Sequence, residues 1–483
     1  MRWLDLAVVV LYLAGITWFG ARFRRSQRTL KDYFLGGKTA PWWAIALSIV
    51  SAETSTLTVI GTPALAFRGD FGFLQLVLGY LLARIVIAAL FLPAYFRGEM
   101  YTAYELMRVR FGNRIRRLTA ATFLVLRALA EGVRVFAISI VVSVVLGAGE
   151  TASIIAILCL TLFYTYEGGM TAVIWTDVAQ MFLYVAGAVA SLIFLLREIP
   201  GGWAHVAAVA APLGKFQVFD FRLAPAAEFF ARPYSFWAGI LGGCFLTTAS
   251  HGTEQLIVQR LLAAPTQRHS RAALLGSWLV IMIQFTLFLT IGACLFTLYR
   301  DRGQPPPAVL DSLYPRYVWQ SLPTGVAGLV IASILAAAMS NLSAALNALA
   351  STTVLDLWKP LASVTSDDAR WLVRSRRATV VWGGVLFAVA LLARHWGSVL
   401  EAGLSIASIL YGSLLGVFLV GLLTRRVGES AAMCGMSVGF VLLLYIKFQT
   451  PIAFTWYVLI GSAATFGTAL AMSLILKENR AKS

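Results

Sequence analysis

Thirteen apolar segments, each between 16 and 34 residues long, restrict this sequence to a narrow class of folds. An α-helix needs about 20 mostly apolar residues to cross the hydrocarbon core of a bilayer. A crossing segment finds no water there, so it must satisfy its own backbone hydrogen bonds, as a helix does. The sequence therefore predicts an all-α polytopic membrane protein. The predicted transmembrane helices cover residues 3–21, 41–67, 71–95, 118–147, 151–166, 172–196, 234–256, 272–299, 322–355, 378–394, 397–423, 430–446 and 453–476.

The positive net charge of the chain is also explained by a membrane-protein fold. Hydrophobic residues make up 59% of the sequence and charged residues only 13%, with a formal net charge of +17. In a soluble protein this charge would indicate nucleic acid. In a membrane protein, Lys and Arg gather in the cytoplasmic loops. We therefore expect the basic residues to contact the lipid bilayer, and we expect no nucleic acid as a partner.

The distribution of Lys and Arg predicts the orientation of the helices. With thirteen spans and the N-terminus outside, 25 of the 39 basic residues fall in cytoplasmic segments and 11 in external ones. This bias predicts an external N-terminus and a cytoplasmic C-terminus. The expected location is a cell membrane of the bacterial inner-membrane type.

Hydropathy alone suggests an internal symmetry within one transport domain over residues 1–483. Residues 41–196 hold five predicted helices and residues 234–423 hold another five, with one leading and two trailing helices. Two groups with an odd number of helices must have opposite topology. The opening helix of each group carries polar residues and glycines. Interrupted helices at matching positions in two halves point to a transporter binding site near the middle of the membrane.

The polar run at residues 51–58, Ser-Ala-Glu-Thr-Ser-Thr-Leu-Thr, is the clearest candidate site. Serines and threonines alone would favour a helix–helix contact that uses small hydroxyl residues for packing. Glu53 reverses this preference, because a charge at mid-membrane costs a few kcal/mol or more and usually faces a functional cavity. Gly61 and Pro63 close by permit a local break in this helix, which would free backbone carbonyls to bind a ligand.

A second polar face lies in the predicted helix 322–355. Ala337, Ser340 and Asn341 are spaced i, i+3 and i+4, so they share one side of a helix. A carbonyl, a hydroxyl and an amide oxygen suit a small hard cation. The alternative is a packing face of small residues. Carbonyls offered by Ser51 and Thr54 from a broken helix opposite this face favour the cation.

Charged residues also occur inside other predicted helices. Arg127, Glu131 and Arg134 have the spacing of intrahelical ion pairs, and we favour this structural role. The alternative is that Arg134 anchors a substrate carboxylate. Asp177, near the predicted cytoplasmic edge of a helix, is expected to be a solvated acid at a helix start.

Several motifs, in order and spacing, resemble the sodium:solute symporter family over nearly the whole chain. The resemblance implies the five-plus-five inverted-repeat fold of the leucine transporter type, with an extra leading helix. The motifs are Asp-Tyr-Phe-Leu-Gly-Gly-Lys at 32–38 with Trp42 and Trp43, Gly-Gly-Met-Thr-Ala-Val-Ile-Trp-Thr-Asp at 168–177 with Gln180, Gly-Thr-Glu-Gln at 252–255 with Gln259 and Arg260, and Leu322, Pro323 and 337–340 in the eighth core helix.

The resemblance implies two groups of site residues. A sodium site would use the carbonyls of Ser51, Thr54 and Ala337 with the side chains of Ser340 and Asn341, where the family more often has Ser or Thr at 341. Asp177 would lie on the sodium exit route. The candidate substrate residues are Glu53, Ser55, Thr58, Gln75, Glu131 and Arg134.

These features predict a secondary active transporter and not an enzyme, working as a monomer. It would couple a co-transported sodium ion to a small polar organic solute by alternating access. Sugars or polyols, sialic-acid-like or other carboxylates, and amino acids stay open as the solute. Two alternatives stay open as well: a proton-coupled carrier that uses Glu53, and a receptor of the same fold that binds solute without moving it.

Overall fold

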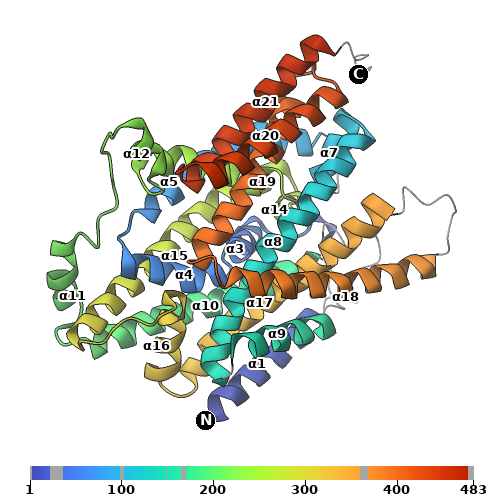
Figure 1. Cartoon of the computed structure of the whole chain (residues 1–483). Coiled ribbons are helices and arrows are strands. Elements are labelled where there is room, and N and C mark those ends of the chain that lie inside the picture. Colours follow the sequence, from blue (N-terminus) through green and yellow to red (C-terminus); the bar gives the residue numbers. More distant parts are fainter. Residues whose placement is uncertain are drawn as a thin grey trace.

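The computed structural model describes residues 3–21, 36–97, 103–147, 149–164, 170–358 and 368–476. Throughout these residues the chain forms helices and connecting segments, with no strand, so the predicted all-α class is confirmed. Figure 1 shows the helices gathered in one bundle, with α3 near its middle. This arrangement surrounds the polar run of the sequence with other helices, as a functional interior requires.

Each of the thirteen predicted segments contains helix. In chain order the corresponding elements are α1 (Trp3–Ala21), α3 (Trp42–Glu53) with α4 (Thr56–Arg68), α5 (Phe73–Val86) with η3 (Ile87–Phe91) and α6 (Leu92–Tyr95), α8 (Asn113–Leu146), α9 (Glu150–Tyr164), α10 (Met170–Glu198), η5 (Ala238–Gly242) with α13 (Gly243–Gly252), α15 (Gln267–Asp301), α17 (Val326–Ser351) with η7 (Thr352–Trp358), α18 (Asp368–Ala393), α19 (Val399–Leu423), α20 (Glu429–Gln449) and α21 (Tyr457–Ile475). Shorter elements between them are η2 (Gly36–Lys38), α7 (Ala103–Arg110), α11 (Gly202–Ala210), η4 (Ala211–Leu213), α12 (Ala226–Ala231), α14 (Gln255–Leu262), η6 (Leu310–Ser312), α16 (Leu313–Ser321) and η9 (Phe454–Trp456).

Length and apolar character separate these helices into two groups. Within the described residues, seven helices are long and apolar enough to cross a membrane, and the bent pair α3–α4 makes an eighth. The other five predicted segments fall on α1, α9, α13, α17 and α18 with their neighbouring turns. The membrane-protein class is therefore clear, whereas the count of thirteen crossings stays a prediction.

The first interrupted helix is broken at the polar run, as predicted. Helix α3 ends at Glu53 and α4 begins at Thr56, with a bend of 65° between their axes. Thr54 and Ser55 adopt extended backbone conformations between the two. Gly61 and Pro63 lie inside α4. A Cβ at Gly61 would come within 2.7 Å of Leu400 Cβ, so this glycine permits close packing against α19.

The second interrupted helix meets the first half of the molecule through glycines. A Cβ at Gly79 of α5 would lie 2.6 Å from the carbonyl oxygens of Gly239 and Ile240 in η5. One turn later, a Cβ at Gly243 would lie 2.2 Å from the Leu76 carbonyl oxygen. The two backbones therefore touch, as small residues allow in membrane helix pairs. Beyond this contact, α13 ends at Gly252 and the chain turns into α14.

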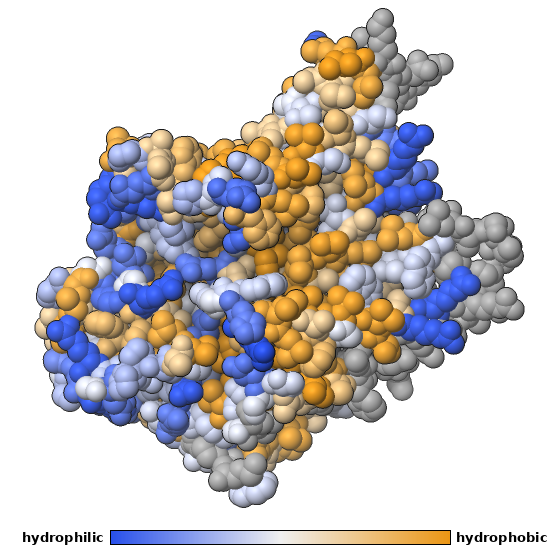
Figure 2. Space-filling view, in the orientation of Figure 1, coloured by the Kyte–Doolittle hydropathy of each residue, from blue (hydrophilic) through white to orange (hydrophobic). Residues whose placement is uncertain are grey.

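The surface matches a bilayer environment. Figure 2 shows hydrophobic residues over much of one face, including α20 and α21, with hydrophilic residues in patches at the left and right edges and in the lower centre. Large apolar side chains such as Val441, Phe448 and Leu474 are more than half exposed on these two helices. In a soluble protein such a surface would be unstable, whereas lipid accommodates it.

Candidate functional site

The break between α3 and α4 borders a cavity of about 150 Å³ near the middle of the bundle. Helices α3, α4, α8, α13, α14, α17 and α19 all contribute to its wall, so both halves of the sequence meet here. Apolar side chains cover much of the wall, as in most small-molecule sites. The polar and charged residues in the wall are Glu53, Ser55, Thr58, Tyr80, Arg127, Arg134, Thr247, Ser250, His251, Glu254, Asn341 and Tyr411.

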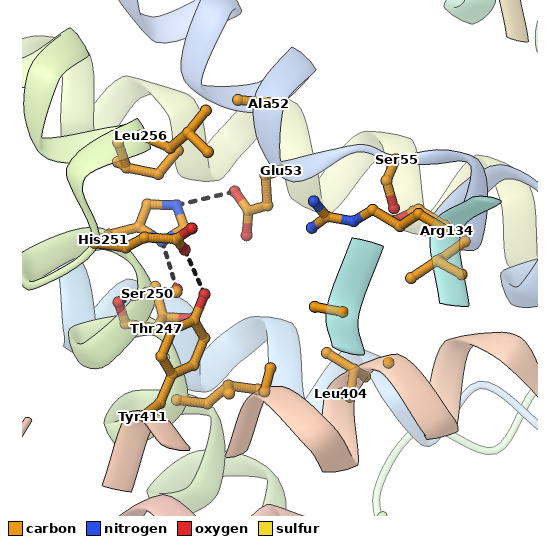
Figure 3. Close-up of a pocket in the computed structure, with 18 of the residues that line it drawn as sticks. Ala52, Glu53, Ser55, Arg134, Thr247, Ser250, His251, Leu256, Leu404 and Tyr411 are labelled. Carbon is orange, nitrogen blue, oxygen red and sulfur yellow. Dashed lines mark hydrogen bonds and ion pairs between the residues drawn. The ribbon is translucent and has the colours of Figure 1, made fainter. Parts of the chain in front are cut away.

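Glu53 is held by partners from the other helices. Nη2 of Arg84, on α5, donates to Oε2 of Glu53 at 2.7 Å, and the Arg84 side chain is fully buried. His251 Nε2 lies 3.3 Å from the same carboxylate oxygen, and Ser250 Oγ lies 2.8 Å from His251 Nδ1 (Figure 3). The carboxylate at the end of α3 is thus engaged by a buried cation, the arrangement that a membrane interior tolerates.

A second group of charges lies on α8. Glu131 accepts from Arg127 at 2.9 Å and from Nη1 of Arg134, so the predicted intrahelical ion pairs are present. Arg127 also donates to Glu254 at 2.7 Å, and the Tyr411 hydroxyl donates to the other oxygen of that carboxylate. Glu254 and Tyr411 therefore join α8 to the turn after α13 and to α19.

Arg134 differs from the other two arginines at this site. Its side chain is 25% exposed, and its buried Nε has no hydrogen-bond partner among the described residues. Figure 3 shows its guanidinium pointing across the cavity toward Glu53. A guanidinium presents several donors in one plane, so this group is placed to bind a carboxylate.

Of the predicted ion residues, Ser51 and Thr54 lie at the helix break and Asn341 lies in the wall of the cavity beside it. Ser51 lies in the last turn of α3, where carbonyls have no intrahelical donor. Thr54 is in the break itself, and its hydroxyl accepts from Gln284 Nε2 of α15 at 2.7 Å. Asn341 lines the cavity together with Glu53 and Ser55. Ala337 and Ser340 belong to α17, but their side chains lie outside the described residues.

Three other predicted residues lie elsewhere. The Gln75 side chain is fully buried outside the cavity wall, donates to Tyr234 O at 2.6 Å and accepts from Asp220 N at 3.0 Å. Glu131 is buried behind Arg127 and Arg134 and does not line the cavity. The expectation that Asp177 is solvated is wrong. Its side chain is buried, accepts from Ser48 Oγ at 2.6 Å and pairs with Arg260 at 2.9 Å.

Sequence reasoning missed two important members of the site. Arg84 is a lone charge in an apolar helix, which is itself a signal of a buried partner. His251 lies in the polar run that precedes Glu254 and forms part of the second interrupted helix. Pairing either residue with Glu53 required the three-dimensional structure, because 31 and 198 positions separate them along the chain.

Comparisons with known proteins agree with this architecture. The model of the family described as "Sodium:solute symporter family" matches residues 33–439. The sodium-coupled monocarboxylate transporter 1 of Mus musculus is 30% identical over 91% of this chain and 72% of its own length. The sodium/iodide cotransporter of Homo sapiens is 28% identical over 91% of this chain and 68% of its own length.

A bacterial relative and a solved structure extend the likeness. The sodium/sialic acid symporter SiaT of Proteus mirabilis is 26% identical over 95% of this chain and 92% of its own length. The solved substrate-bound, outward-open structure of a Na⁺-coupled sialic acid symporter has a TM-score of 0.84, is 24% identical, and covers 99% of both chains. These matches confirm the predicted family and its coupling ion. The chain belongs to the sodium:solute symporter family of multi-pass membrane transporters, whose coupling ion is sodium.

Proposed function

We propose that this protein carries a small organic carboxylate together with sodium by alternating access. It would act as a monomer in a bacterial-type inner membrane, with thirteen crossings, an external N-terminus and a cytoplasmic C-terminus. Residues 41–196 and 234–423 would be its inverted repeats. Helix in every predicted segment and the unequal distribution of basic residues support this arrangement.

The observation that carries the choice of solute is the partly exposed Arg134 in the cavity wall. Glu53 and Glu254 are already paired with Arg84 and Arg127. Among the residues that the structure describes, Arg134 pairs only with the neighbouring Glu131 on its own helix. Charged hydrogen bonds between guanidinium and carboxylate are strong and directional. Three relatives are named for anions or acids, namely monocarboxylates, iodide and sialic acid, and they support an anionic solute here.

The balance of charge agrees with such a solute. Arg84, Arg127 and Arg134 are matched by three carboxylates in the ion pairs at the cavity. Together these three arginines and three carboxylates carry no net charge. One sodium ion and one monocarboxylate would add no net charge to the cavity. This matters because uncompensated charge is unfavourable in a membrane interior.

The remaining polar groups divide between solute and ion. Ser55, Thr58, Thr247 and His251 would contact hydroxyl or carbonyl groups of the solute beyond its carboxylate. The carbonyls of Ser51, Thr54 and Ala337, with Ser340 and Asn341, would hold sodium. The C-terminal end of α3 supports this site, because a helix C-terminus carries partial negative charge that attracts cations.

The test is uptake into proteoliposomes with an imposed sodium gradient, using radiolabelled lactate and pyruvate against glucose as a neutral solute. We expect carboxylate uptake that is lost when choline replaces sodium. Arg134→Gln should raise the KM at least tenfold, since a hydrogen bond to a charged group contributes about 1.5–3 kcal/mol. Arg302→Gln is the matched control, because Arg302 pairs with Glu198 on the exposed surface.

Two results would overturn the proposal. Equal uptake in sodium and choline would exclude sodium coupling for these solutes. An unchanged KM in Arg134→Gln would exclude Arg134 as the carboxylate anchor. Uptake driven by a proton gradient and abolished by Glu53→Gln would favour the proton-coupled alternative, although Glu53 is engaged by Arg84 in this structure.

A further inference from the structure

The short helix α14 (Gln255–Leu262) lies against the cavity, and the predicted topology places it on the cytoplasmic side. It follows α13 after a turn at Thr253 and Glu254, where the backbone leaves the helical conformation. Leu256 and Ile257 of α14 line the cavity directly. Helix α14 also packs against α3, α7, α13 and α15. This helix therefore forms part of the floor that separates the cavity from the predicted cytoplasmic side.

Buried ion pairs fix both ends of α14. At its start, Glu254 accepts from Arg127 of α8 at 2.7 Å and from the Tyr411 hydroxyl of α19. Near its end, Arg260 pairs with Asp177 of α10. Each end thus contacts a different part of the bundle, and both ion pairs hold the floor in its present position.

All three nitrogen atoms of the Arg260 guanidinium group donate hydrogen bonds. Nη2 donates to Asp177 Oδ2 at 2.9 Å, Nε donates to Ser48 Oγ at 2.9 Å, and Nη1 donates to the Leu256 carbonyl at 2.7 Å. Ser48 in turn donates to Asp177 at 2.6 Å. Arg260 is 3% exposed and Asp177 5% exposed. A small cation approaching this carboxylate would find the position already occupied by another cation.

The Arg260 contact is close to the proposed sodium site. Ser48 lies one helical turn before Ser51, on the same face of α3. On α10, Tyr184 lies two turns beyond Asp177, so these two residues also share a face. The buried Tyr184 hydroxyl lies close to the hydroxyls of Ser51 and Thr54. Polar groups therefore lead from the helix break toward Asp177.

We propose that Arg260 is a tethered cation that closes the cytoplasmic ion route, and that α14 is the gate that carries it. This inference rests on the proposed function for the presence of sodium in that route. While Arg260 holds Asp177, sodium cannot reach this carboxylate and the floor stays closed. Withdrawal of Arg260 exposes both the route and the cavity to the cytoplasmic side.

The arrangement explains why opening depends on sodium. Moving Arg260 away leaves the buried Asp177 carboxylate without its cation, which is unfavourable. A sodium ion that moves down from the helix break replaces the lost charge at Asp177. The gate therefore opens more readily when the ion is present, and sodium release and gate opening become one event. A ligand shifts a conformational equilibrium only through such a difference in affinity.

The experiment measures access to the cavity and needs no transport. Ala407, in the cavity wall on α19, is replaced by Cys in a variant whose four native cysteines are removed. A membrane-impermeant maleimide is applied to inside-out vesicles without sodium. Arg260→Gln should raise the labelling rate at least tenfold over the parent. Arg271→Gln is the control with an unchanged rate, because Arg271 donates to the Ala88 carbonyl on another helix.

A second variant covers the case in which Arg260→Gln does not fold. Arg260→Lys keeps the charge but loses the branched donors, so its labelling should rise about threefold in the absence of sodium. A labelling rate equal to the parent in whichever folded Arg260 variant is obtained would overturn the proposal. Because the assay contains no solute and no sodium gradient, its failure is distinguishable from failure of carboxylate uptake.

Discussion

At the scale of residues, the sequence located the unusual charge but not its partner. Glu53 stands out in an apolar helix, and on sequence alone it could contact a solute, carry a proton or balance an ion. The fully buried Arg84 narrows this choice, because its guanidinium occupies Oε2 of Glu53. This is why we propose Arg134 for the contact with the solute, since it keeps a quarter of its side chain exposed.

This pairing predicts a specific pattern of stability. Arg84→Gln leaves Glu53 as an unpaired buried charge, and removing one partner of such a pair costs about 3–5 kcal/mol. Glu53→Gln combined with Arg84→Gln removes both charges and should recover more than half of the lost stability. Thermal unfolding of the purified protein in detergent measures both changes. Arg222→Gln is the control and should leave the unfolding temperature nearly unchanged, because Arg222 is mostly exposed in its pair with Asp220.

If the double variant is as unstable as Arg84→Gln alone, then Arg84 stabilises the fold by its packing and not by its charge. Arg84 also donates to Ser277 Oγ at 3.1 Å, so a small residual loss is expected in both variants.

Ion pairs within one helix were predictable from the spacing of the residues, whereas ion pairs between different helices were not. The i, i+3 and i+4 spacing of Arg127, Glu131 and Arg134 predicted their ion pairs, because neighbouring turns of a helix fix that geometry. No such rule connects Asp177 to Arg260, 83 positions apart, and the solvated environment expected for Asp177 was therefore wrong.

At the scale of elements, hydropathy and the polar run predicted where the first core helix breaks, but not what its glycine and proline do. The break lies at Thr54 and Ser55, next to the carbonyls that were predicted to bind the ion. Pro63 is tolerated inside α4, and Gly61 serves a close contact with α19. Such glycines are needed for tertiary packing, which a single helix segment does not reveal.

Close packing of this kind gives a prediction for the contact between α5 and η5. Gly79→Ala places a methyl group 2.6 Å from two backbone carbonyl oxygens, which cannot rotate away. Forcing the two backbones apart should cost about 1–3 kcal/mol. Gly384→Ala in α18 is the matched control, because a Cβ there meets nothing within 4 Å. It should leave stability unchanged or raise it by up to about 1 kcal/mol through helix propensity.

Thermal unfolding of the two alanine variants, prepared side by side, provides the comparison. Equal stability of Gly79→Ala and Gly384→Ala would mean that the two elements are not in backbone contact in the membrane.

At the scale of the whole molecule, one cavity and one helix break connect two halves of the chain that lack recognisable sequence similarity to each other. The family and the all-α class followed from motifs spread over the sequence, and the family match over residues 33–439 confirms them. The site depends on contacts among α3, α8, α13, α17 and α19, which hydropathy does not encode. The sequence therefore predicted the transporter family and many of the polar residues of the cavity, but few of the residues that pair with them.

The shared helix break predicts that solute and sodium bind cooperatively. Sodium at Ser51 and Thr54 would order the segment that continues into Ser55 and the cavity wall, so the solute would then bind an ordered site. We expect sodium to lower the Kd for a monocarboxylate about tenfold, and the solute must tighten sodium binding by the same factor. Isothermal titration of the purified protein, with choline replacing sodium, measures both factors. In Arg134→Gln the solute effect should vanish while sodium still binds. A solute affinity that is the same with and without sodium would mean that the break does not couple the two sites, and that their transport, if linked, is linked at the gate.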